Sequence, residues 1–187
     1  MPKETKEKQS EFFAKDKASL EAWLTQHASE SGSTWLVYYK PSLKRSDLTY
    51  SLIVDTLLCF GWVDSLPRKV DVERTSLRIS PRNPKSAWSK INKEKVRRLK
   101  KEGRMRPQGE AAVTLARRSG TWDALNDVEN LLLPDDLKKA LKAEGKSSAW
   151  EEKPRSWKRG RLEMLLNAKG QATREKRIAA FLAELAR

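Results

Sequence analysis

Proline and glycine divide the second half of this 187-residue chain into segments of helical length. Proline suits the first position of a helix and glycine the position just past its end, so a segment that runs from one to the other predicts a helix. The expected helices cover residues 84–101, 107–118, 134–145 and 154–168. Thr173 is expected to cap a final helix. The chain from residue 107 onward should therefore be entirely helical.

The first half mixes helix and strand signals. Asp16 or Ser19 is expected to cap a helix that reaches His27, and Thr49 to cap a helix over residues 50–59. Runs that are rich in β-branched and aromatic residues predict strands. These runs cover residues 34–40, 62–66 and 75–80. The fold class is therefore α+β: a small antiparallel sheet of about three strands packed with helices, followed by an all-helical C-terminal subdomain.

Three ranges describe the expected organisation of what should be one compact domain. A flexible N-terminal segment covers residues 1–18, an α+β part covers residues 19–106, and a helical part covers residues 107–187. A chain of this length buries about 70% of the surface that its unfolded form exposes, so it needs neither a disulfide nor a metal to be stable.

The cysteine, histidine and apolar content of the chain indicates its compartment and whether it holds a metal. Its one cysteine, Cys59, and its one histidine, His27, form no zinc-ligand pattern. Residues 1–18 hold no apolar core of signal-peptide length, and no stretch approaches the roughly 20 apolar residues of a membrane helix. We expect a soluble cytoplasmic protein with no membrane insertion, no metal and no cofactor. The sequence does not predict its oligomeric state.

Positive charge is concentrated in two segments. The net charge is +14, which attracts polyanions such as nucleic acid. Residues 78–106 hold twelve basic and two acidic side chains, and residues 153–177 hold nine basic and two acidic ones. A coat that served only solubility would not need such clustering. The two segments are expected to form one basic face.

An anion site is predicted where the first basic segment begins. Arg78, Arg82, Lys85 and Ser86 lie before or at the expected start of the helix at Pro84. Free backbone N–H groups and the helix dipole favour anions at such a place. A solvated basic turn without a ligand is the equally weighted alternative.

The helix predicted over residues 84–101 carries two polar residues on its apolar face, and these suggest a pocket. At 100° per residue, Asn92 and Lys95 fall on the arc that carries Trp88, Ile91, Val96 and Leu99. The ordinary interpretation is an amphipathic helix whose Lys95 extends outward. The alternative is a polar pocket under the Trp88 ring, with Asn92 and Lys95 directed at a ligand. Such a pocket would lie between the two motifs, lined by Trp62, Asp64, Arg82, Trp88 and Asn92.

Signals of catalysis are weak. Cys59 lies in a leucine-rich helix, where it should pack as a small apolar residue, and nothing orients His27 toward it. No P-loop, dinucleotide fingerprint, Gly-x-Ser-x-Gly motif or paired-carboxylate helix occurs. We expect no catalytic residue, although the pocket interpretation leaves an enzyme open.

Two motifs carry a family resemblance. Residues 57–65, LLCFGWVDS, contain a Cys-Phe-Gly-Trp-x-Asp motif, and residues 81–92 read Pro-Arg-x-Pro-x-Ser-x-Trp-Ser-x-x-Asn. Together with AKGQATREKRI at 168–178, they closely resemble the bacterial YdeI/OmpD-associated family, also labelled bacteriocin-protection proteins. The resemblance implies a role in envelope stress or in protection from antimicrobial peptides, without an established reaction.

A non-enzymatic stress or antimicrobial-protection module that binds an anionic ligand or nucleic acid is the function we predict. Many antimicrobial peptides are cationic, so a chain of charge +14 should repel them and protect indirectly. The first alternative is a small-molecule-binding protein or enzyme that uses a pocket between the two tryptophan motifs. The second is a protein–protein adaptor that uses exposed tryptophans such as Trp150 and Trp157.

Overall fold

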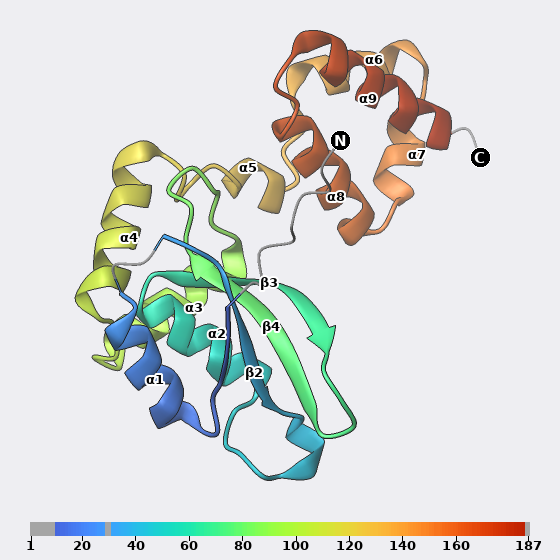
Figure 1. Ribbon diagram of the computed structural model, residues 1–187. Helices are drawn as coiled ribbons and strands as arrows, with labels where there is room; N and C mark the ends of the chain where they lie inside the picture. Colours follow the sequence, from blue (N-terminus) through green and yellow to red (C-terminus); the bar gives the residue numbers. More distant parts are fainter. Residues whose placement is uncertain (1–9, 29–30, 186–187) are drawn as a thin grey trace, which may run out of the picture. The chain divides into compact units, whose positions relative to one another are not determined.

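The computed structural model describes residues 10–28 and 31–185, and these form two compact units. Unit 1 extends to Trp122 and unit 2 begins at Asp123. The α+β class is confirmed (Figure 1). Helix α4 (Pro107–Ser119) belongs to unit 1, and the helical unit begins after Trp122 and not at residue 107.

The sheet of unit 1 has four strands where about three were predicted. Its order is β1 (Glu11–Phe13), β2 (Thr34–Tyr39), β4 (Arg74–Pro81), β3 (Trp62–Lys69). Strand β1 is the one that was missed, and it lies within the segment predicted to be flexible. It pairs in parallel with β2, whereas β2, β4 and β3 are antiparallel to their neighbours. The sheet is therefore mixed and not purely antiparallel.

Helix α2 (Tyr50–Cys59) lies at the centre of unit 1. It contacts β3 and also helices α1 (Lys17–Gln26), α3 (Lys90–Lys101) and α4 (Figure 1). The whole run 53–59 is buried, which explains why this segment is so apolar. The predicted caps are confirmed: Asp16 accepts from the Ser19 backbone N–H at 2.8 Å, and Thr49 Oγ1 accepts from Leu52 N–H at 3.2 Å.

Helix α3 begins six residues later than predicted. Asn83 Oδ1 accepts from Lys85 N–H at 2.9 Å, as a helix cap would, but only a tight turn follows it and not a helix. Trp88 N–H donates to Thr121 O at 3.2 Å, which holds this stretch in a tertiary contact. Ser89 is the cap, with Oγ 3.3 Å from Asn92 N.

Helix α4 follows the proline–glycine rule. Pro107 occupies its first turn, and Gly120 follows its last residue with φ +79°, a backbone conformation that glycine adopts without strain. A short 3₁₀ turn (Pro41–Leu43) completes unit 1.

Unit 2 is helical. Its elements are α5 (Asn126–Glu129), α6 (Asp135–Ala143), α7 (Ser147–Glu152), α8 (Arg155–Leu166) and α9 (Gln171–Glu184). The short α5 and α7 were not predicted, and α9 begins after Gly170, so Thr173 lies inside the helix and does not cap it. Large apolar side chains pack in the interior of the unit, among them Leu137, Leu141, Trp150, Leu165 and Phe181.

Candidate functional site

Arg82 and Trp88 are the two predicted site residues that the structure brings into direct contact. Arg82 follows β4 and is fixed by its backbone N–H, which donates to Gly61 O at 2.9 Å. Its guanidinium carbon lies 3.8 Å from the centre of the Trp88 ring, and an η nitrogen donates to Ala87 O at 2.7 Å. Trp88 is 2% exposed and its ring lies 5.1 Å from that of Trp122. The indole thus forms a rigid platform under the guanidinium.

These two side chains form one side of a cleft in unit 1 with a volume of about 170 Å³. The same side includes Asn83 and Pro84. The opposite side is helix α4, which contributes Ala111, Ala112, Leu115 and Ala116. Arg82 is the one ionisable side chain in this lining, and the α4 wall is apolar.

Arg82 has an unusual electrostatic environment. Burial lowers the pKa of its guanidinium to about 10. Within the described residues no carboxylate pairs with it, and its Nε is buried without a hydrogen-bond partner. Contact with Trp88 and one backbone carbonyl offsets part of the desolvation cost. A partly desolvated cation without a described counter-ion therefore lies beside the cleft.

The other predicted anion-site residues have local roles. Arg78 lies on β4 and donates to Ser33 Oγ, at 2.9 Å from an η nitrogen. Lys85 and Ser86 are exposed, and both bond to Asn83, Ser86 through its Oγ at 2.7 Å from Asn83 O. The backbone of this turn is therefore occupied, and the helix start predicted at Pro84 is absent here.

Two residues of the pocket predicted between the tryptophan motifs, Trp62 and Asp64, make contacts elsewhere in unit 1. Trp62 is 2% exposed and packs edge-to-face on Trp23, with ring centres 5.5 Å apart. Asp64 accepts from the Tyr50 hydroxyl at 2.8 Å, and burial together with this bond raises the pKa of Tyr50 to about 12. Arg82 and Trp88 line the cleft described above, whereas Trp62, Asp64, Asn92 and Lys95 are not among its lining residues.

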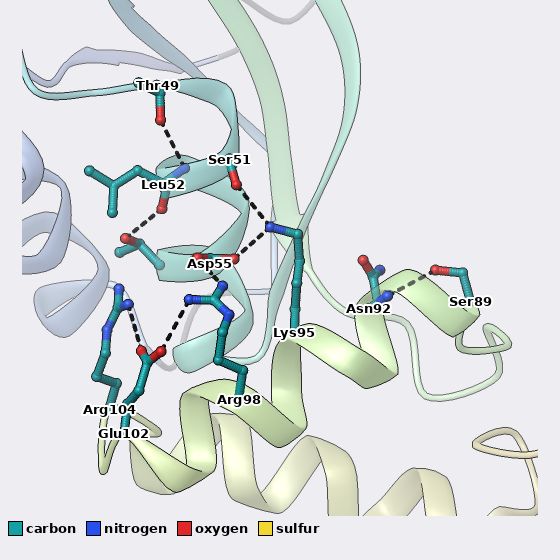
Figure 2. A network of polar contacts seen from close by, with 11 residues as sticks. Thr49, Ser51, Leu52, Asp55, Ser89, Asn92, Lys95, Arg98, Glu102 and Arg104 are labelled. Atoms are coloured by element: carbon teal, nitrogen blue, oxygen red, sulfur yellow. Dashed lines mark hydrogen bonds and ion pairs between the residues drawn. The ribbon is translucent and has the colours of Figure 1, made fainter.

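Lys95 takes part in a partly buried ion-pair network that was not predicted from the sequence. Figure 2 shows Lys95 and Arg98 extending from α3 toward Asp55 of α2, with Asn92 beside Ser89. Asp55 has a side chain that is 7% exposed, and its oxygens lie 2.6 Å from Lys95 Nζ and 2.5 Å from Arg98. Burial alone would raise the pKa of Asp55, but the hydrogen bonds from Lys95 and Arg98 outweigh it and lower the pKa. The signal available in the sequence was a lone carboxylate within an otherwise apolar, leucine-rich helix.

A stripe of cations follows the outer face of α3. Lys90, Arg97 and Lys101 are exposed, and none has an ion-pair partner among the described residues. At 100° per residue these three cations fall within about 40° of one another, opposite the buried Leu99, and the exposed Glu94 lies on the same face. We call these three residues the α3 stripe.

Part of the charge of the second basic segment is neutralised inside unit 2, as Lys95, Arg98, Lys100 and Arg104 of the first segment are inside unit 1. Arg159 pairs with Glu129 at 2.9 Å and with Glu163 at 2.8 Å. Carboxylates of unit 2 also pair with Lys158, Arg161 and Arg174. The first segment lies in unit 1 and the second in unit 2, so a joint basic face stays a prediction.

The remaining conspicuous residues are structural. Trp150 is 2% exposed, so it does not offer the exposed surface that the adaptor interpretation requires, and Trp157 packs on it with ring centres 5.4 Å apart. Cys59 is buried, which raises the pKa of its thiol. Within the described residues, none of the helices combines the length and apolar composition needed to cross a membrane.

The fold is thus that of an α+β unit followed by a helical unit. Residues 12–112 match a family described as "Domain of unknown function (DUF8412)"; since this is more than half of the chain, the chain belongs to that family. Residues 130–187 match the family described as "Bacteriocin-protection, YdeI or OmpD-Associated", which confirms the resemblance suspected from the sequence. The chain has no match among the curated proteins or among the solved structures.

The boundaries of the two matches fit the two units. The first match lies within unit 1 and the second within unit 2. The motifs with Trp62 and Trp88 therefore fall in the first matched range, and the signature at residues 168–178 falls in the second.

Proposed function

We propose that the protein is a non-enzymatic, stress-associated cytoplasmic module whose unit 1 binds a small anionic ligand in the cleft between Arg82 and α4. One observation carries this proposal: Arg82 is a partly buried guanidinium that no described carboxylate neutralises. A buried charge is costly unless it is paired, and proteins that retain such a charge beside a cleft commonly do so for function. An anion in the cleft would supply the missing partner.

Replacing Arg82 by Met tests this proposal. Met keeps an apolar chain of similar length over Trp88 but removes the charge. Since a charge-assisted hydrogen bond contributes about 1.5–3 kcal/mol, affinity for the anion should fall at least about tenfold. The measurement is an NMR titration of the full chain with acetate and with phosphate at constant ionic strength, which follows the backbone amides around the cleft.

Arg97→Met is the matched control, because Arg97 is exposed on α3 and is not part of the cleft. It removes the same charge from unit 1 and should leave the titration unchanged. Equal binding by Arg82→Met and the wild-type protein would refute the proposal, provided that both give dispersed spectra.

Nucleic acid at the α3 stripe is the second candidate function, and the unpaired state of its three cations within the described residues supports it. Each phosphate that a cation neutralises contributes about −0.9 to the slope of log affinity against log salt for duplex DNA. Changing Lys90, Arg97 and Lys101 together to Gln should therefore reduce the magnitude of that slope by up to about 2.7. Fluorescence anisotropy with labelled duplex DNA between 50 and 200 mM salt, roughly the range over which this effect is large, measures it.

A second triple variant separates local contact from net charge. Lys138, Lys139 and Lys142 are exposed on α6 of unit 2, and their change to Gln removes the same three charges. If the α6 variant lowers the slope as much as the α3 variant does, attraction is diffuse and the α3 stripe is not a binding site.

A further inference from the structure

The composition of the cleft narrows the class of anion that it can hold. The lining supplies one positive charge, from Arg82, and the wall from α4 is alanine and leucine. A doubly charged group such as phosphate would bring a second negative charge into apolar surroundings that hold nothing to neutralise it. A monoanion matches the single guanidinium.

The geometry of Arg82 favours a carboxylate among monoanions. Its guanidinium carbon lies 3.8 Å from the centre of the Trp88 ring, and one η nitrogen already donates to Ala87 O. Within the described residues, no hydrogen bond uses Nε or the second η nitrogen. Planar carboxylates match the donors at the edge of a guanidinium, and the contact with Trp88 limits how that guanidinium can turn.

The volume of the cleft and its apolar wall then indicate the size and character of the rest of the ligand. The cleft is small, with a volume of about 170 Å³. Most sites for drug-sized ligands are larger, at about 300–1,000 Å³. The cleft therefore suits a carboxylate with two to four carbons attached, and those carbons would lie against Ala111, Ala112 and Leu115.

We infer that the cleft between Arg82 and α4 binds a monocarboxylate with a short hydrocarbon body, an inference that rests on the function proposed above. Two sources offer this chemistry: a free short-chain acid, or the C-terminal carboxylate of a polypeptide that ends in a small apolar residue. Leu115 lies at the cleft and is 46% exposed, so the hydrocarbon end remains reachable from solvent.

A series of probes tests the inference by NMR titration of the full chain. Affinity should rise about fourfold for each methylene from acetate to butyrate, the equivalent of about 0.8 kcal/mol per buried methylene. Butyrate should therefore bind about 15-fold more tightly than acetate, and phosphate and sulfate should bind more weakly than butyrate. A short peptide ending in alanine, made once with a free C-terminal carboxylate and once as the amide, separates the two sources. If the carboxylate form of the peptide binds more tightly than butyrate, the ligand is the end of a polypeptide. If butyrate binds more tightly, the ligand is a free short-chain acid.

The variant Ala111→Leu checks the placement of the hydrocarbon without touching Arg82. Ala111 is exposed on α4, where leucine preserves the helix, and the larger side chain should fill the cleft. It should remove the advantage of butyrate over acetate while acetate still binds. If phosphate binds at least as tightly as butyrate in a manner that needs Arg82, the carboxylate inference is wrong and the proposed function stands. If no anion gives a change that Arg82→Met abolishes, both fail.

Discussion

Replacing Gly109 by Ala is expected to lower the free energy of unfolding of unit 1 by about 3 kcal/mol, at the upper end of what overpacking a core costs. A Cβ atom at this position would lie 2.2 Å from Cys59 O and 2.8 Å from Leu58 O. Both are backbone atoms of α2, so no side-chain rotation relieves the clash, and α4 must move away from α2. Urea unfolding of the full chain, with NMR signals of the two units followed separately, measures the change.

Gly160 provides the matched control for this substitution. It lies within α8 of unit 2, and a Cβ there would meet nothing within 4 Å. Gly160→Ala should stabilise its unit by about 0.5–1 kcal/mol, because alanine is the better helix former. Should Gly109→Ala prove as harmless as Gly160→Ala, the close approach of α2 and α4 would not exist in solution. The α4 wall of the cleft would then be misplaced as well.

Helix boundaries that depend on local chemistry could be predicted from the sequence. Thr49 and Pro107 begin helices, and Gly120 follows one, because a cap, a fixed φ and a left-handed residue act within a few positions of the chain. The predicted start of α3 was wrong because this boundary does not depend on local chemistry alone. A contact distant in sequence, between Trp88 N–H and Thr121 O, decides that residues 84–88 are not helical.

Strand β1 illustrates a second limit. Its three residues lie in a polar stretch without alternation, and they form a strand because β2 offers a parallel partner. Such pairing is invisible in a local pattern. The number of strands was therefore underestimated, although the fold class was correct.

The candidate site was predictable in part. The predicted pocket included Arg82 and Trp88, and these two side chains are in contact. The opposite wall could not be predicted, because alanines and a leucine of α4 carry no chemical signal and reach the cleft only through tertiary packing. The sequence pattern puts Asn92 and Lys95 on the same face of α3 as its apolar residues. In the structure, however, Lys95 forms an ion pair with Asp55 of α2.

Replacing Asp55 by Asn is expected to cost unit 1 about 3 kcal/mol of unfolding free energy at neutral pH. The change keeps the shape of the side chain but removes the charge that Lys95 and Arg98 share. Lys95 has a side chain that is 20% exposed, so it would remain as a poorly solvated, unpaired cation. Urea unfolding at pH 7 measures the loss. Glu110→Gln, which breaks the exposed pair with Lys100 on the same unit, should cost less than about 1 kcal/mol.

The pH dependence of the stability difference between the wild-type protein and Asp55→Asn gives a sharper test of this ion pair. Since the pKa of Asp55 is lowered in the folded protein, its stabilisation is fully present above the ordinary aspartate value near 3.9 and is lost as pH falls through the folded value. The difference between wild-type protein and Asp55→Asn should therefore be constant from about pH 7 to pH 5 and should shrink below about pH 4. Asp16 and Asp136, whose pKa values are also lowered, titrate in both proteins and cancel in the comparison. A difference that stays constant down to pH 2, well below the ordinary aspartate pKa, would show that the charge of Asp55 is not what joins α2 to α3.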